Sequence, residues 1–192
     1  KHIIKSVASR FGFVATFMPK PIFGQNGSGM HVHYSLWDDK NNCNAFYAGA
    51  DDLNLSDTAK AFLNGNVKYL SELAAFINPT VNSYKRLVPG YEAPVFICVG
   101  KMNRSAAIRI PLVNSGQPSA TRAELRAPDP ACNPYLALGV IGITGLQGIK
   151  ENNVNLKTVS QSLYKLSSDE IKALGISSLP ASLEQALNNL GP

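Results

Sequence analysis

The chain has 192 residues, 45% of them hydrophobic, which fits one domain that can bury a sizeable core. Its net charge is +5, but only 16% of the residues are charged and no dense Lys/Arg block appears. A phosphate-bearing small molecule therefore fits this charge at least as well as nucleic acid does, and we expect no nucleic-acid partner. Three cysteines without paired spacing favour a reducing compartment, so we expect a single cytoplasmic domain over residues 1–192.

The N-terminal part of the sequence predicts a helix followed by two strands. Residues 1–11 follow a helical period with apolar side chains on one side. A chain that opens inside a helix, without Met or a signal-peptide core, suggests a piece of a longer protein. Residues 13–18 predict a strand that ends at two prolines. An alternating strand then runs to Asp38, and a polar loop covers 39–55.

The remaining segments predict an α+β fold. The clearest helix covers 56–77, with Ser56 or Asp57 as its cap, and an irregular segment follows from 78 to 94. Strands are expected at 95–99, 105–110 and 121–127, an apolar helix at 133–150, and a short helix near the C-terminus. The apolar stretch 135–149 is too short and too rich in glycine to cross a bilayer, so we expect a buried helix and no membrane partner.

The most informative stretch is 26–33, NGSGMHVH, a small polar loop that runs into an alternating segment. In an extended strand every second residue points the same way, so His31, His33, Ser35 and Trp37 share one face. Glycines allow close approach of a ligand to free backbone N–H groups, and the stretch therefore suggests a metal-and-phosphate site. The alternative is a hairpin loop and a half-buried strand with two incidental histidines.

Four arginines form a second candidate group. Arg104 and Arg109 flank an apolar run, whereas Arg122 and Arg126 alternate with Glu124 on one strand face. Guanidinium groups suit a phosphate or a carboxylate, while the glutamate can hold a cation. The alternative is a ladder of salt bridges on a solvated face.

Segment 82–94 is pinned by two prolines and one glycine and carries the charges of Arg86 and Glu92. A loop of this length in a compact domain is typical of a functional flap, and we expect it to be poorly ordered. The alternative is a rigid surface connection.

Taken together, the motifs resemble glutamine synthetase of the bacterial and archaeal type over nearly the whole chain. In order they are NGSGMHVH, KRLVPGYEAP, NRSAAIRIP, RAELRAPDP and NPYLA, which begin at residues 26, 85, 103, 122 and 133. The resemblance implies a curved antiparallel sheet, part of the family's half-barrel, packed with helices. It also implies that the chain is a C-terminal part of the catalytic domain, without the family's N-terminal β-grasp domain and upstream metal-binding strands.

The family makes glutamine from glutamate, ATP and ammonia through a γ-glutamyl phosphate, with Mg²⁺ or Mn²⁺ on the phosphates. Full-length relatives form ring-shaped homo-oligomers, dodecamers in the bacterial type. By motif position the resemblance implies metal ligands at His31 and Glu124, and glutamate contacts at Asn26, Gly27, Arg86, Glu92 and Arg126. It implies ATP contacts at His33, Ser35, Arg104, Arg109 and Arg122. The catalytic residues would be Glu92, as the flap base, and Arg104 and Arg109, as phosphate clamps.

Two positions depart from the family pattern. Ser119 stands where many members carry a lysine, which removes one nucleotide contact. Tyr164 loosely resembles a tyrosine that is adenylylated in some bacterial members, but the acidic and proline residues around it are missing.

The sequence separates poorly one alternative, a γ-glutamyl ligase that uses a polyamine or another amine. A non-catalytic relative of the fold is disfavoured, because it should have lost some of the motif residues, and all six are present: His31, Glu92, Arg104, Arg109, Glu124 and Arg126. A stand-alone nucleotide-binding module is disfavoured because the motifs supply half-sites only. The chain supplies His31 and Glu124 to one metal ion and nothing identifiable to a second. We therefore expect the chain on its own to be inactive.

Overall fold

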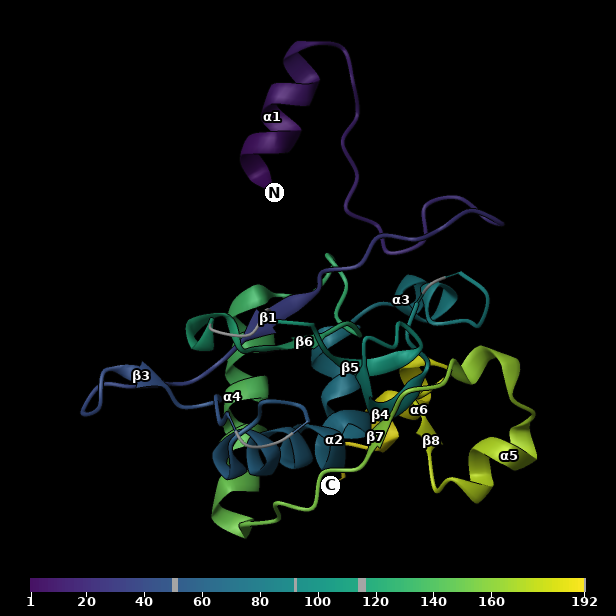
Figure 1. Cartoon of the computed structure of the whole chain (residues 1–192). Coiled ribbons are helices and arrows are strands. Elements are labelled where there is room, and N and C mark those ends of the chain that lie inside the picture. Colours follow the sequence, from purple (N-terminus) through teal and green to yellow (C-terminus); the bar gives the residue numbers. More distant parts are fainter. Residues whose placement is uncertain (50–51, 92, 114–116, 192) are drawn as a thin grey trace.

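A computed structural model describes residues 1–49, 52–91, 93–113 and 117–191, and the backbone alone for Ser168. Helices and strands are mixed along the chain, which confirms the α+β class (Figure 1). The α-helices are α1 His2–Arg10, α2 Asp57–Ile77, α3 Val81–Arg86, α4 Pro134–Glu151, α5 Ser168–Ala173 and α6 Leu183–Asn188. The strands are β1 Val32–Tyr34, β2 Trp37–Asp38, β3 Cys43–Asn44, β4 Phe96–Lys101, β5 Ala106–Ile110, β6 Ala123–Leu125, β7 Thr158–Val159 and β8 Ser177–Ser178. Two short 3₁₀ helices cover Pro118–Ala120 and Leu163–Lys165.

The main sheet has the strand order β1-β6-β5-β4-β7, and β8 adds to β4. We expected an antiparallel sheet, and the half formed by β1, β6 and β5 is antiparallel. The other half corrects this expectation, because β4 runs parallel to both β5 and β7. The chain returns from β4 to β5 through residues 102–105, passing close to Gly100. A Cβ atom on Gly100 would lie 2.6 Å from the Cβ of Asn103, so glycine is needed for this tight return.

Helices α2 and α4 pack against each other backbone to backbone. A Cβ atom on Gly65 would lie 2.7 Å from the Cα of Gly148, and one on Gly145 would overlap the ring of Phe62. The buried side of α2 joins the core under the sheet, together with residues of β4, β5 and β6. Both long helices begin where the sequence predicts, because Ser56 and Asn133 accept hydrogen bonds from the first turns.

One face of α4 differs from the sequence expectation of a buried helix. Its buried residues lie on the α2 side, but five large apolar side chains are exposed: Tyr135, Leu136, Leu138, Ile143 and Leu146. The predicted helix is therefore confirmed, but only one side of it is buried. No helix in the described part of the chain is long and apolar enough to cross a membrane.

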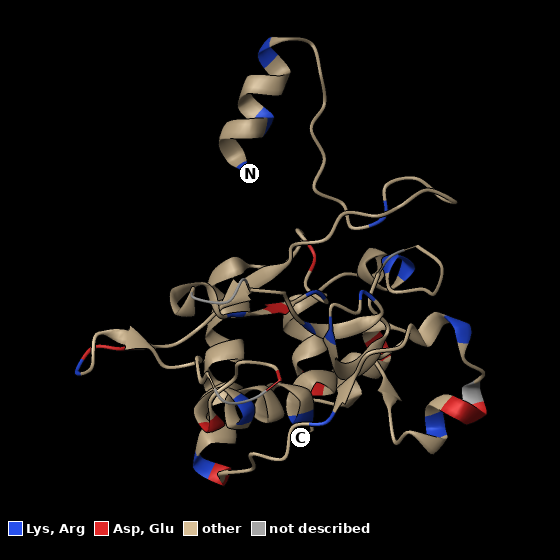
Figure 2. Ribbon diagram, viewed as in Figure 1, with Lys and Arg blue, Asp and Glu red and all other residues tan. Residues whose placement is uncertain are grey.

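In Figure 1 helix α1 stands out from the body of the molecule, and at its start Lys1 Nζ donates to Cys132 O (2.9 Å). Helix α1 forms where the sequence predicts, but it buries none of its residues. The strand expected at 13–18 is wrong, since this stretch is extended without assigned strand structure. A strand needs a hydrogen-bonded neighbour, and in the described chain this stretch only leads to Pro19 and Pro21. In Figure 2 the segment before β1 carries Lys and Arg but no acidic residue.

Segment 78–94 is more ordered than the sequence suggests. Helix α3 occupies its first half, capped by Thr80, whose hydroxyl accepts from the Ser83 amide (3.1 Å) while the Thr80 amide donates to the Ser83 hydroxyl (3.2 Å). Tyr84, Arg86 and other residues of the segment are buried. The expectation of a poorly ordered loop is therefore wrong for this half, because a capped helix holds it on the core.

Candidate functional site

Glu124 lies at the centre of the charged residues that the sequence singled out. It stands on β6 between β1 and β5, directly opposite His33 on one side and Arg109 on the other. His31, just before β1, places its Nδ1 2.8 Å from Glu124 Oε1, and His33 Nε2 lies 3.9 Å from the same oxygen. The expectation that His31 and Glu124 share one face of adjacent strands is thus confirmed.

Cationic side chains enclose the Glu124 carboxylate. Arg109 Nε donates to Oε2, and Arg126 Nε lies 3.8 Å from Oε1. The carboxylate is 3% exposed, and a buried carboxylate is stable only with such partners. The strand face is therefore no solvated salt-bridge ladder. It is a buried acidic centre that two histidines reach from the exposed side.

The pKa of His31 lies below its ordinary value of 6.5, mainly because the ring is partly buried. Arg126 and Arg86 lower this pKa further, whereas Glu124 opposes the shift. The imidazole is therefore neutral at pH 7, which is the form that ligates metal. His31 Nδ1 and Glu124 Oε1 lie 2.8 Å apart, so the two side chains are close enough to reach one bound ion. In the described part of the chain no group of three His, Cys, Asp or Glu side chains gathers for a metal ion.

A cavity of about 230 Å³ opens beside His31. It brings together four of the five residues predicted to contact glutamate, from three separate segments. Its lining consists of Asn26, Gly27, Gly29, His31, Arg86, Tyr91, Ala93 and Arg126. Pockets for drug-sized ligands typically hold about 300–1,000 Å³, so this one suits a molecule of amino-acid size better than a nucleotide. Two guanidinium groups in its wall suit an anionic ligand.

Arg86 is locked in place by the end of β6. Its Nη1 donates to Ala127 O (2.8 Å) and its Nη2 to Arg126 O (3.0 Å). Burial lowers the pKa of Arg86 to about 10, with Asp129 opposing the shift, so the group stays charged at neutral pH. A guanidinium has five N–H donors, and these two bonds leave others for a ligand.

The two loop glycines are required by packing against Arg86 and Pro19. A Cβ atom on Gly29 would lie 2.6 Å from Arg86 Nη2, and one on Gly27 would lie 2.4 Å from Pro19 O. The Ser28 amide donates to Pro19 O (2.8 Å) and the Met30 amide to Pro128 O (2.9 Å). We expected free N–H groups in this loop. This expectation is wrong for Ser28 and Met30, whose amides bond to other parts of the protein and hold the loop in place.

The residues predicted to contact ATP lie on the other side of Glu124. Arg122 Nε donates to His33 Nδ1 (3.2 Å), and Ser35 follows β1 on the same exposed face. Arg104 lies in the return between β4 and β5, where its carbonyl oxygen accepts from Arg126. The described lining of the 230 Å³ cavity does not include these residues.

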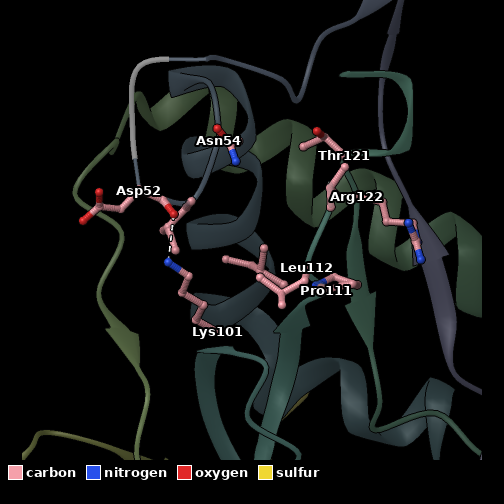
Figure 3. A pocket seen from close by; sticks show the side chains of 10 residues that line it. Asp52, Asn54, Lys101, Pro111, Leu112, Thr121 and Arg122 are labelled. Carbon is pink, nitrogen blue, oxygen red and sulfur yellow. Dashed lines mark hydrogen bonds between the residues drawn. The ribbon is translucent and has the colours of Figure 1, made fainter. Parts of the chain in front are cut away.

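A small hollow lies beside Arg122 (Figure 3). Lys101 Nζ donates there to Asp52 O (2.9 Å), and the Arg122 side chain points away from it. Its volume is about 30 Å³, which is far too small for a nucleotide. Ser119 lies nearby, exposed in the 3₁₀ helix that precedes β6.

Glu92, the predicted flap carboxylate, lies outside the described residues. Its neighbours Tyr91 and Ala93 both line the cavity. Tyr164 donates its hydroxyl to Ala93 O (2.5 Å), so this phenol is bonded to the chain next to the cavity. Tyr91 and the buried Lys20 were not among the site residues predicted from the sequence. The signal that could have found Lys20 is its position between two prolines, directly before the glycine loop.

Comparison with known proteins agrees with this geometry. The family model "Glutamine synthetase, catalytic domain" matches residues 1–191. The chain is 51% identical to glutamine synthetase of Thermococcus kodakarensis over 99% of its length and 41% of that relative. Among solved structures, "Apo GmaS without ligand" gives a TM-score of 0.83 at 40% identity, over 98% of this chain and 41% of that one. A structure of Plasmodium falciparum glutamine synthetase gives a TM-score of 0.82 at 33% sequence identity, over 98% of this chain and 43% of that one. The chain thus spans about two fifths of the length of these proteins.

Proposed function

Because the chain belongs to the glutamine synthetase family, we propose that the protein that carries it ligates ammonia to glutamate at the expense of ATP. In the first step the γ-phosphoryl group of ATP moves to the side-chain carboxylate of glutamate, giving γ-glutamyl phosphate and ADP. In the second step ammonia attacks the acyl carbon, the bond to phosphate breaks, and glutamine and phosphate leave.

The observation that carries this proposal is the cavity beside His31. Arg86 and Arg126 line it from two segments and provide positive charge for an amino acid with two carboxylates. Asn26 and Gly27 line it from the glycine loop, where the backbone approaches Arg86 closely. We assign the glutamate substrate to this cavity, with Arg86 held ready by its two bonds to carbonyl oxygens.

His31 and Glu124 are the residues that would hold Mg²⁺ or Mn²⁺. Their paired nitrogen and oxygen fit one ion, which would neutralise charge on the phosphate groups. Hard divalent ions take about six ligands, so the remaining ones must come from water, substrate or residues beyond this set. On the far side of Glu124, we assign ATP to His33, Ser35 and Arg122.

Arg104 and Arg109 are proposed to clamp the transferred phosphoryl group. Arg109 approaches Glu124 from β5, so its guanidinium lies where the cavity side and the ATP side of the site meet. A guanidinium in this place meets the charge that develops as phosphate is transferred and released. For Glu92 we retain the role of a base that takes the proton of the incoming ammonium ion.

The same reasoning extends to the whole protein. We propose a cytoplasmic ring dodecamer, consistent with the free thiols of Cys43, Cys98 and Cys132. Catalysis by the 192-residue chain alone is not expected, because among its described residues two ligands serve one metal ion and no third joins them.

The test is ATP-dependent glutamine formation, measured with glutamate, ammonium and Mg²⁺ or Mn²⁺ for the full-length protein and for this chain alone. We expect turnover from the full-length protein, near the roughly 10 per second of a typical enzyme, and none from the chain. A polyamine in place of ammonium tests the alternative ligase. Turnover with the amine but not with ammonium would overturn the proposed acceptor, and full turnover by the chain alone would overturn the metal-ligand reasoning.

A further inference from the structure

Lys20 is a buried cation that the proposed mechanism does not use. It is 7% exposed, and lysine is almost never buried to this extent without partners. Its Nζ donates to Gln25 O and lies 3.7 Å from the centroid of the Tyr91 ring. Within about 6 Å a cation is attracted to an aromatic face, and more strongly when it is desolvated.

The backbone of Lys20 is fixed as firmly as its side chain. Its amide donates to Asn82 Oδ1 (2.7 Å), and the Asn82 side chain donates back to Lys20 O (3.0 Å). Asn82 belongs to α3, the helix that also carries Arg86. Lys20 therefore joins three segments: the start of the glycine loop at Gln25, helix α3, and the turn at Tyr91.

These three segments form the walls of the proposed glutamate cavity. Gln25 directly precedes Asn26 and Gly27, and the next amide, that of Ser28, is bonded to Pro19, the neighbour of Lys20. Tyr91 lines the glutamate cavity and also a second cavity of about 630 Å³, which Lys20 lines as well. The Lys20 ammonium therefore contacts a ring that forms part of the glutamate cavity.

We propose that Lys20 is a positioning residue for the glutamate cavity, an inference that rests on the proposed function. Its ammonium orients the Gln25 carbonyl and holds the Tyr91 ring in place, so that the loop and the ring keep the shape that glutamate needs. Without it, the loop and the ring gain freedom that substrate binding must remove. The ATP side, beyond Glu124, has no share in this contact network among the described residues.

The test uses Lys20→Met in the full-length protein, which keeps an unbranched side chain, one heavy atom shorter, and removes the charge. We expect the KM for glutamate to rise about tenfold while the KM for ATP stays within about twofold, since the lost contact is a charge-assisted hydrogen bond. Lys20→Arg should restore much of the glutamate affinity, because a guanidinium can also donate and stack. Lys85→Met is the matched control, since Lys85 lines the same larger cavity but is exposed, and it should leave both KM values unchanged.

Tyr91→Leu provides a second test if Lys20→Met does not fold. It removes the ring that the Lys20 ammonium contacts and should raise the KM for glutamate while leaving the KM for ATP within about twofold. An unchanged KM for glutamate in Tyr91→Leu or Lys20→Met, or equal rises for glutamate and ATP, would overturn the positioning role.

Amide hydrogen exchange separates this inference from the proposed function. In the full-length protein, Lys20→Met should speed exchange at the Ser28 amide, and Lys85→Met should not. If the full-length protein forms no glutamine but Ser28 responds in this way, the proposed function fails and the positioning role stands. An unchanged rate at Ser28 refutes the positioning role whatever the activity.

Discussion

The contact between α2 and α4 allows a single methyl group to be used as a test of the fold. A Cβ atom on Gly148 would lie 2.2 Å from Ala61 O and 2.7 Å from the Cα of Gly65. Both of these atoms belong to the backbone of the facing helix, so no flexible side chain can move aside. Gly148→Ala must therefore push the two helices apart along their contact.

The expected loss follows from two opposing effects. Overpacking typically costs about 1–3 kcal/mol, and a backbone clash of this kind belongs at the upper end. Alanine gains about 1 kcal/mol over glycine in a helix. The free energy of unfolding should therefore fall by about 2 kcal/mol, and Tm by about 4–8 °C for a chain of this size.

Gly142→Ala is the matched control in the same helix. A Cβ atom on Gly142 meets nothing within 4 Å, so only the helix propensity changes. We expect this variant to be more stable by up to about 1 kcal/mol. Both are measured by thermal and denaturant unfolding, followed by circular dichroism. If Gly148→Ala were as stable as the wild type, or if both variants lost the same stability, the α2–α4 contact would be wrong.

Three further changes test the site and the core. In the full-length protein Arg109→Ala should lower kcat by about 10²–10³-fold and change the KM for glutamate little, because a phosphate clamp acts mainly in the transition state. An unchanged kcat with a raised KM for glutamate would show that Arg109 contacts the substrate instead. Tyr34→Phe should lower the free energy of unfolding by about 1–3 kcal/mol, since the Tyr34 hydroxyl donates to the buried Asn66 Oδ1 (2.8 Å), and a loss near zero in denaturant unfolding would contradict this. Hydrogen bonds from Lys68, Gln147 and Tyr69 lower the pKa of Glu151 from 4.5 to about 2, so its stabilisation is present above pH 4.5 and is lost as the pH falls through 2. Glu151→Gln should therefore destabilise the chain at neutral pH and come close to the wild type near pH 2, and a stability difference that does not depend on pH would refute the ion pair with Lys68.

Elements determined by local sequence could be predicted. The helix at 57–77 has a capping serine and a regular apolar period, and both are visible without any tertiary information. The alternation around β1 is also local, and the exposed and half-buried residues from His31 to Asp38 follow it. Their phase placed His31, His33 and Glu124 on one face, and the structure brings them together.

Elements that depend on contacts with distant parts of the chain could not be predicted from the sequence. Helix α3 was missed because Ser83 completes its capping box, where the usual signal is Glu or Gln. The parallel pairing of β4 and β5 was missed because four residues normally suggest a hairpin, and only the closeness of Gly100 to Asn103 allows the other path. Whether 13–18 forms a strand depends on a neighbour that no local pattern reveals.

The candidate site shows the same division. The motif residues were predicted, but the bonds that hold them were not. Arg86 reaches the carbonyl oxygens of Arg126 and Ala127 across 40 residues or more of sequence, and Lys20 reaches α3 across 62. Such contacts come from the packing of α3 on the end of β6, which residue types and spacing do not specify.

The strand order around Glu124 also bears on the order in which the strands pair during folding. Arg109 and Glu124 are separated by 15 residues and meet across neighbouring strands, whereas Arg122 and His33 are separated by 89. Closing the longer loop costs about 1.6 kcal/mol more chain entropy, so the pairing of β1 with β6 should form later during folding. Glu124 would then be neutralised by arginine before either histidine arrives. The folding chain would not carry an unpaired buried carboxylate at any stage, and the histidine side of the site would be the last to close and the first to open.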